Sequence, residues 1–193
     1  MLAIDLCCGV GGWTRGLLHV GFHVIGFDIA RPPRFPDRAL FVQQDVRTIS
    51  GRSWRGRVDV IIASPPCRVF TNMWRVSRKP RPPIEEGLAL VRHCFRIASE
   101  AHAPIIVENV MGAQQWLGMA VRHVGPYYLW GDVPPILPRG SFTKGIWNTQ
   151  HGRSTGRESA RRRRRKYVRA PHERAEIPME LAVPIAWWFA RAS

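Results

Sequence analysis

A run rich in β-branched apolar residues, Val58–Ala63, is followed directly by Ser64-Pro65-Pro66, and it constrains the fold more than any other stretch. Runs of this kind are typical of strands that a parallel sheet buries on both faces. The two prolines end the strand and stiffen the next turn, so Cys67 is predicted to lie at the carboxyl end of a central strand. Open α/β sheets bind their ligands at that edge, where a thiol on a rigid turn can act as a nucleophile. The alternative for Cys67 is the usual fate of a free cysteine, a small buried apolar side chain.

The length of 193 residues predicts a single domain, spanning residues 1–193, with a hydrophobic core of its own. No apolar run approaches the length of a membrane span, and the amino terminus shows no basic leader. The four cysteines contain no C-x-x-C pair, which argues against a zinc site and against a disulfide framework. We therefore expect a cytoplasmic protein without a metal or a membrane partner, and we expect it to be a monomer.

Charge is the strongest compositional signal, because 29 Lys and Arg residues stand against 14 Asp and Glu, giving a net charge of +15. Residues 151–170 hold nine of the basic residues and only Glu158, and so contribute +8. A basic flexible segment is predicted at about 151–171, because it contains a low-complexity run that cannot build a core: Arg161, Arg162, Arg163, Arg164, Arg165 and Lys166. Such clustering indicates a polyanionic partner, most often nucleic acid, rather than a merely soluble basic surface.

Three stretches near the amino terminus each place ligand-binding residue types after a predicted strand. Residues 2–6 form the first strand, and a glycine turn over 7–12 leads into a helix over 13–20. Gly9 and Gly11 let the backbone approach a ligand closely, although such turns also serve as plain tight turns. The second strand, 23–28, ends at Asp28, which can accept bonds from ribose hydroxyls. The third, within 39–46, includes Asp45, which can accept from an adenine amino group; for both acids a helix cap is the alternative.

The stretch after Cys67, residues 68–83, is basic, contains no acid and interleaves aromatic residues. Its basic side chains are predicted to contact phosphates, and Trp74 or Phe70 is predicted to pack against bases. The alternative is a surface loop with one buried aromatic side chain. The predicted phosphate contacts are Arg68, Arg75, Arg78, Lys79 and Arg81.

The rest of the chain continues the alternation of helices and strands. A helix is predicted over 84–101 and a buried strand over 104–107, so Glu108 arrives at the same sheet edge as Cys67. A carboxyl group there can act as a proton donor; the alternative is an acid at the start of a helix over about 112–123. A short strand near 127–130 and a docking helix over 177–190, with Pro178 in its first turn, complete the prediction.

Five motifs together resemble, in order and spacing, those of the DNA (cytosine-5) methyltransferase family, over roughly residues 1–125. They are Asp5-Leu6-Cys7-Cys8-Gly9-Val10-Gly11-Gly12, Phe27-Asp28-Ile29, Gln44-Asp45-Val46, Ser64-Pro65-Pro66-Cys67-Arg68-Val69-Phe70-Thr71 and Glu108-Asn109-Val110. The stretches 128–131 and 177–181 are similar to compact, phage-like members. The resemblance implies the Rossmann-like α/β fold of the class I S-adenosylmethionine-dependent methyltransferases. This fold has a mostly parallel seven-stranded sheet with helices on both faces. It also implies a bacterial or phage-infected cytoplasm.

The same resemblance implies roles for individual residues. S-adenosylmethionine would be the methyl donor, with S-adenosylhomocysteine as the product, and double-stranded DNA with a flipped-out cytosine would be the substrate. Cys67 would attack cytosine C6, and Glu108 would hydrogen-bond N3 and the exocyclic amine. Arg68, which follows the nucleophile where the family usually has Gln, is expected to act with Cys67 and Glu108 as a third catalytic residue. The residues that would contact the donor are Cys7, Gly9, Val10, Gly11, Asp28, Ile29, Asp45, Val46 and Pro66.

Departures from the family pattern leave other functions open. Cys7 stands where the family usually has Phe, and a downstream Gln-x-Arg-x-Arg motif is not clearly present. Ser64-Pro65-Pro66 fits half of the signature of amino-group methyltransferases, which act on cytosine N4 or adenine N6. Cys67 and Glu108 argue against that class and against a non-catalytic DNA-binding relative. The basic run does not distinguish DNA from RNA.

Overall fold

The computed structural model describes residues 1–71, 82–135 and 176–192 of the chain. Several predictions fall outside these ranges: the basic segment 151–171 with Arg161–Lys166, and the proposed nucleic-acid contacts Trp74, Arg75, Arg78, Lys79 and Arg81. Within the described ranges, no helix combines the length and the apolar character that a membrane span requires.

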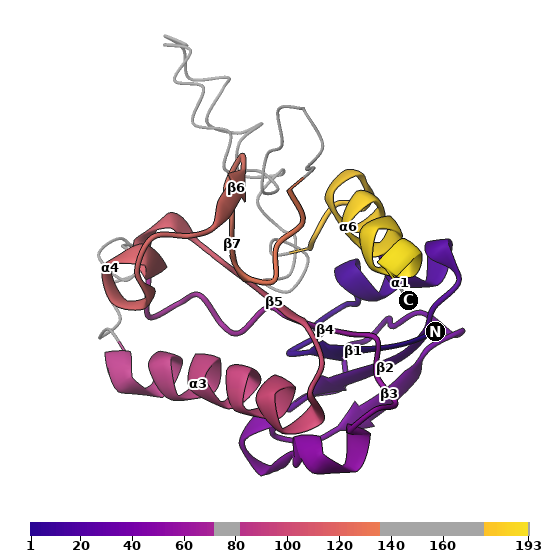
Figure 1. Ribbon diagram of the computed structural model, residues 1–193. Coiled ribbons are helices and arrows are strands. Elements are labelled where there is room, and N and C mark those ends of the chain that lie inside the picture. Colours follow the sequence, from indigo (N-terminus) through magenta and orange to yellow (C-terminus); the bar gives the residue numbers. More distant parts are fainter. Residues whose placement is uncertain (72–81, 136–175, 193) are drawn as a thin grey trace, which may run out of the picture.

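One seven-stranded sheet runs through the described part of the chain in the order β3-β2-β1-β4-β5-β7-β6 (Figure 1). All neighbouring pairs are parallel except β5–β7 and β6–β7, which are antiparallel. The strands are β1 Leu2–Leu6, β2 His23–Asp28, β3 Leu40–Gln43, β4 Val60–Ala63, β5 Ile105–Asn109, β6 Arg122–Val124 and β7 Tyr127–Gly131. This topology confirms the predicted fold, including the parallel pairing of the first strand with the strand that precedes Ser64.

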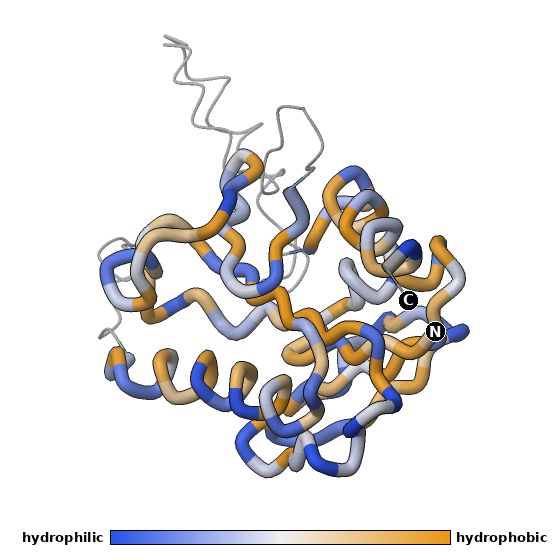
Figure 2. The backbone as a smooth tube through the Cα atoms, in the orientation of Figure 1, coloured by the Kyte–Doolittle hydropathy of each residue, from blue (hydrophilic) through white to orange (hydrophobic). Residues whose placement is uncertain are grey.

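Alternation along the central strands builds two hydrophobic layers, one on each face of the sheet. Figure 2 shows the hydrophobic stretches of the backbone in orange. One layer contains Ile4 and Ile61 and packs against α3, Ile84–Ala101. The other contains Val60 and Ile62 and packs against the pair α1, Gly12–Val20, and α6, Met179–Ala192 (Figure 1). Helices therefore cover both faces of the sheet, as expected for strands buried on both sides.

Helix α6 crosses α1 closely, and this contact ties the carboxyl-terminal end of the chain to the helix that follows the glycine turn. A Cβ added at Gly16 would lie 2.3 Å from the Cβ of Ala182, so only glycine allows the helices to approach this far. Arg15 forms an ion pair with Glu176, whose backbone carbonyl also accepts from the Tyr127 hydroxyl. The predicted docking helix is thus confirmed.

Two stretches differ from the prediction. The helix expected over 112–123 is instead a 3₁₀ turn η3, Met111–Ala113, a short helix α4, Gln114–Leu117, and the strand β6. Gly118 ends α4 at φ +79°, and its carbonyl accepts from the Trp130 indole at 3.0 Å, which turns the chain toward β6. The third strand ends at Gln43, and Val46–Thr48 forms a 3₁₀ turn η1, followed by η2 at Gly51–Trp54.

Candidate active site

Three loops meet at the carboxyl edge of the sheet, where the strand order reverses between β1 and β4. They follow β1, β4 and β5, which are adjacent in the sheet. The first carries the glycine turn, the second carries Ser64 and Cys67, and the third begins at the end of β5 with Glu108 and Asn109. Ligands of open α/β sheets bind at such a switch point. The edge predicted from the sequence is therefore the one that the fold builds.

The loop after β4 is held rigidly around Cys67. The Asn109 amide donates to the Pro65 carbonyl at 3.0 Å, and Asn109 itself is only 1% exposed. The backbone N–H of Phe70 donates to the Cys67 carbonyl at 3.0 Å, closing a tight turn. A Cβ added at Gly112 would lie 2.1 Å from the Phe70 carbonyl oxygen, so η3 presses directly on this turn. Cys67 is half-buried, and its neighbours Pro66 and Arg68 are exposed.

Glu108 lies beside this loop and is 5% exposed. Its Oε2 accepts a hydrogen bond from the Ser64 hydroxyl at 3.1 Å, and the Ser64 oxygen accepts from the Trp13 indole N–H at 3.0 Å. The carboxyl group of Glu108 is thus held by a residue three positions before Cys67 in the sequence. The structure brings the predicted nucleophile and the predicted acid to one edge, through a link that the sequence did not indicate.

The glycine turn after β1 adopts the backbone that its residues were predicted to allow. Gly9 and Gly11 have φ of +51° and +81°, in the left-handed region that favours glycine. A Cβ added at Gly9 would meet no atom within 4 Å, whereas one at Gly11 would lie 2.7 Å from the Pro36 ring. The N–H of Gly9 donates to Asp28 Oδ2 at 2.9 Å, so the acid at the end of β2 also orders this turn.

Two other thiols, those of Cys7 and Cys8, lie in the turn after β1. Cys7 has φ of +54°, unusual for a residue other than glycine. Its hydrogen bond with the buried Cys94, together with burial, raises the pKa of the Cys7 thiol well above its usual range. Burial likewise raises the pKa of Cys8. Both thiols therefore stay protonated at neutral pH, which suits packing rather than attack.

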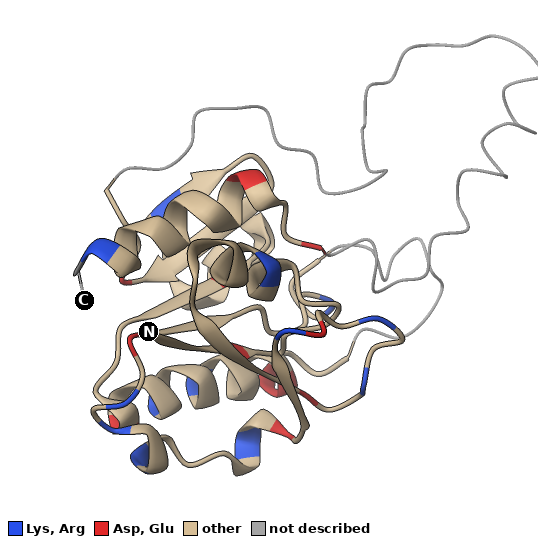
Figure 3. Cartoon of the chain, turned by 90° about the vertical axis from the view of Figure 1, so that its right-hand side faces the viewer, with Lys and Arg blue, Asp and Glu red and all other residues tan. Residues whose placement is uncertain are grey.

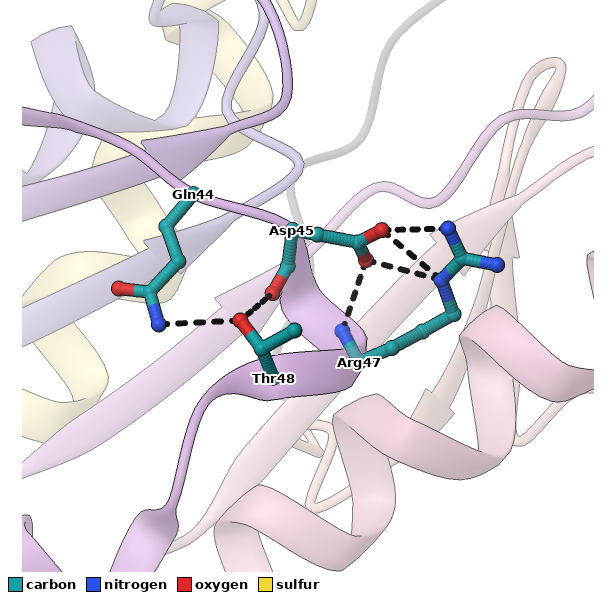
Figure 4. Close-up of polar contacts among 4 residues, drawn as sticks. All are labelled: Gln44, Asp45, Arg47 and Thr48. Atoms are coloured by element: carbon teal, nitrogen blue, oxygen red, sulfur yellow. Dashed lines mark hydrogen bonds and ion pairs between the residues drawn. The ribbon is translucent and has the colours of Figure 1, made fainter.

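Asp45 is engaged by its own turn (Figure 4). Its carboxylate accepts from the Arg47 backbone N–H at 2.9 Å and pairs with the Arg47 guanidinium. These hydrogen bonds hold the pKa of Asp45 below its ordinary value. The cap that the sequence left as an alternative is thus observed, and an adenine amino group would share the carboxylate with Arg47. Of the two other residues expected near adenine, Val46 is buried in the core and Ile29 is 65% exposed.

Asp5 is a buried carboxyl group that sequence reasoning did not assign by itself. It is 0% exposed, and its Oδ2 accepts from the Thr14 hydroxyl at 2.6 Å and from the Thr14 N–H at 3.1 Å. Its Oδ1 is buried without a hydrogen-bond partner among the described residues. Burial raises the pKa of Asp5 from 3.8 to about 7, against the opposing effect of the Thr14 bonds. An acid inside the apolar stretch Leu2–Leu6 was the available signal.

The raised pKa of Asp5 predicts a stability that falls as pH rises. Because the folded state keeps the proton up to about pH 7 and the unfolded chain loses it near pH 4, folding binds a proton between these values. The free energy of unfolding should therefore drop by on the order of 2–4 kcal/mol over that range and level off above it. Urea unfolding across the range should show this drop in the wild type and a flatter profile in Asp5→Asn. The exposed Asp37→Asn is the matched control; a gap between wild type and Asp5→Asn that stays constant with pH contradicts the prediction.

Charge in the described part of the chain is nearly balanced, with 13 Lys and Arg against 12 Asp and Glu, a net charge of +1. Figure 3 shows both signs on several elements of this part, with no single-sign face in that view. Most of the total of +15 therefore belongs to residues 72–81 and 136–175.

Comparisons with known proteins return structural similarity only. No protein-family model matches the chain, and no curated protein matches it. A prophage-encoded protein from E. coli named as a DNA modification methyltransferase is 28% identical with a TM-score of 0.43, over 60% of this chain and 34% of that chain. S. pombe Dnmt2 methyltransferase is 15% identical with a TM-score of 0.42, over 61% and 36%. Magnesium protoporphyrin IX methyltransferase from Synechocystis, with bound S-adenosylmethionine, is 22% identical with a TM-score of 0.39, over 58% and 50%. The chain thus spans about a third to a half of the lengths of these proteins.

Proposed function

We propose that this protein transfers a methyl group from S-adenosylmethionine to C5 of cytosine in DNA. The observation that carries the proposal is that Cys67 and Glu108 belong to adjacent strand ends at one edge of the sheet, where Ser64 of the Cys67 loop hydrogen-bonds Glu108. The turn that contains Gly9 and Gly11, which is bonded to Asp28, follows the neighbouring strand β1. Cytosine C5 is a poor nucleophile until C6 is attacked, so a thiol and an acid aimed at one ring are what this chemistry needs.

The residues at the glycine turn suit the donor, which when bound supplies an electrophilic methyl group on a sulfonium. No atom lies within 4 Å of the position that a Cβ at Gly9 would occupy, so a ligand can approach the backbone there. The Asp28 carboxylate can accept from ribose hydroxyls, and the exposed Ile29 can cover an adenine face. The Oδ1 of Asp5, which has no hydrogen-bond partner within residues 1–71, 82–135 and 176–192, would gain from a nearby ammonium group, because such a group favours the ionised form of a carboxyl.

The chain's own groups then activate the base. The Cys67 thiolate forms a bond to C6, and Glu108 provides a proton at N3, so the electron pair displaced from the ring reaches C5. C5 would then take the methyl group, with S-adenosylhomocysteine as the leaving product, and the proton on N3 would return to Glu108. Loss of the C5 proton to solvent then expels Cys67 as a thiolate and restores the C5–C6 double bond. Because Cys67 is half-buried at the sheet edge, a target base must leave the duplex to reach it.

The proposal is tested directly by incubating the protein with labelled S-adenosylmethionine and duplex DNA, followed by mass spectrometry of the nucleosides. The expected product is 5-methylcytosine. N4-methylcytosine or N6-methyladenine would assign the protein to the amino-group class instead, and label in neither base would leave a non-catalytic relative. A parallel incubation with RNA of the same sequence distinguishes the two polymers.

Asp28→Ala should weaken the binding of S-adenosylmethionine by about 1–3 kcal/mol, the range for an unmade buried hydrogen bond. Titration calorimetry measures this directly. Asp59→Ala is the matched control, because Asp59 also accepts from a backbone N–H, that of Leu2 at 2.6 Å, at the opposite end of β1. Unchanged affinity in Asp28→Ala, or an equal loss in Asp59→Ala, would remove Asp28 from the binding site.

A further inference from the structure

Trp13, Ser64 and Glu108 form one chain of hydrogen bonds across three elements of the fold. Trp13 comes from the first turn of α1, Ser64 directly follows β4, and Glu108 lies on β5. The Trp13–Ser64 hydrogen bond measures 3.0 Å and the Ser64–Glu108 hydrogen bond 3.1 Å. Trp13 is 2% exposed and Glu108 is 5% exposed. From this arrangement we propose that Ser64 is a positioning residue, which fixes the orientation of the Glu108 carboxyl toward the target ring. The inference rests on the function proposed above.

The donor and acceptor of each of these two hydrogen bonds follow from the chemistry of the three side chains. An indole N–H only donates, so the Ser64 oxygen must accept from Trp13. The single hydroxyl proton of Ser64 is then available for Glu108 Oε2. Since Oε2 accepts this bond, a proton that Glu108 carries to the base sits on its other oxygen, Oε1. The hydrogen bond from Ser64 thereby determines which oxygen of Glu108 carries the proton that is donated to the base.

The surroundings keep Ser64 from turning away. Its backbone N–H donates to the Leu6 carbonyl at 3.1 Å, which continues the β1–β4 ladder past the end of the strand. The next carbonyl, that of Pro65, accepts from Asn109, the residue after Glu108. Ser64 is therefore joined to the β5 end by its side chain, and the following residue is joined to it by the backbone. A carboxyl group held within a narrow range of angles is already oriented toward N3 when the base binds. This matters because small misplacements of reacting groups lower the rate strongly.

Removal of the Ser64 hydroxyl should lower the rate of transfer and leave binding unchanged. In Ser64→Ala, kcat for methyl transfer should fall by about 10- to 100-fold, while KM for DNA and the affinity for S-adenosylmethionine remain within about twofold. Ser64→Thr retains a hydroxyl on the same backbone and should restore kcat to within about fivefold of wild type. Trp13→Phe keeps the apolar bulk but frees the hydroxyl to rotate, so it should cost less, about fivefold.

Thermal unfolding of each variant separates these losses from misfolding, and Ser50→Ala, an exposed serine without a side-chain cap bond, serves as the matched control. Wild-type kcat in folded Ser64→Ala overturns the inference. So does a loss that folded Ser64→Thr fails to reverse, or one that appears in KM alone. If the wild type itself transfers no methyl group, the function proposed above fails, and that result is distinct from these.

Discussion

Cys67→Ser is expected to abolish methyl transfer while leaving the binding of S-adenosylmethionine intact. A serine hydroxyl is a far weaker nucleophile than a thiolate at neutral pH, so the rate should fall by about a thousandfold or more. Cofactor affinity should change little, because the proposed donor contacts lie mostly outside the loop after β4, and Pro66, the one proposed within it, is retained in the variant. Nucleoside mass spectrometry and calorimetry on the same preparation measure the two quantities.

Substrate DNA that contains 5-fluorocytosine should trap the wild-type protein as a covalent adduct, because the C5 fluorine cannot leave as a proton does. Cys67→Ser should form no adduct. Cys94→Ala is the matched control, since Cys94 is fully buried on α3 and should leave trapping unaffected in the folded protein. Failure of the wild type to form an adduct while methylation proceeds would indicate amino-group transfer. Methylation that persists in Cys67→Ser would exclude Cys67 as the nucleophile.

The elements with the clearest patterns were predictable from the sequence. The helical spacing of apolar residues gave Ile84–Ala101 with its observed bounds, and buried strands before Ser64 and Glu108 were expected where β4 and β5 lie. Parallel strands share a carboxyl edge, so the meeting of Cys67 and Glu108 at one edge followed from topology alone. These features depend on periodicity and on chain direction, which a sequence records directly.

Other features depend on contacts between residues far apart in the chain. Gly118 ends α4 because its backbone turns at φ +79° and its carbonyl accepts from Trp130, and neither fact is visible in the local pattern. The links from Trp13 to Ser64 and from Ser64 to Glu108 span 51 and 44 residues. Asp45 shows the opposite case, because its partner is only two residues away and the cap was an available alternative. Local sequence patterns thus identified which residues lie at the carboxyl edge of the sheet. Long-range packing determined which of these residues form hydrogen bonds with one another.

Replacing Arg161–Lys166 with Gly and Ser should flatten the salt dependence of DNA binding. The described part of the chain carries a net charge of only +1, so sequence-independent attraction to phosphates must come mainly from the basic stretches outside it. Each phosphate neutralised adds about −0.9 to the slope of log affinity against log salt on duplex DNA. If half of this six-residue run makes contacts, the slope should change by roughly 3 units.

The replacement should weaken binding alike on all sequences, because phosphates carry no base identity. A variant with Arg161–Arg165 changed to Lys is the matched control: it keeps every charge and should keep the slope, since a point charge suffices for phosphate contact. A salt titration of the three proteins measures the slope, and an unchanged slope in the Gly/Ser variant would mean that the run makes no phosphate contact.

Bisulfite mapping of modified DNA tests the sequence selectivity of methylation separately. Methylation confined to one short motif would require base-edge contacts from another part of the chain, which we would seek within residues 126–160, because sequence is read at base edges and not at phosphates.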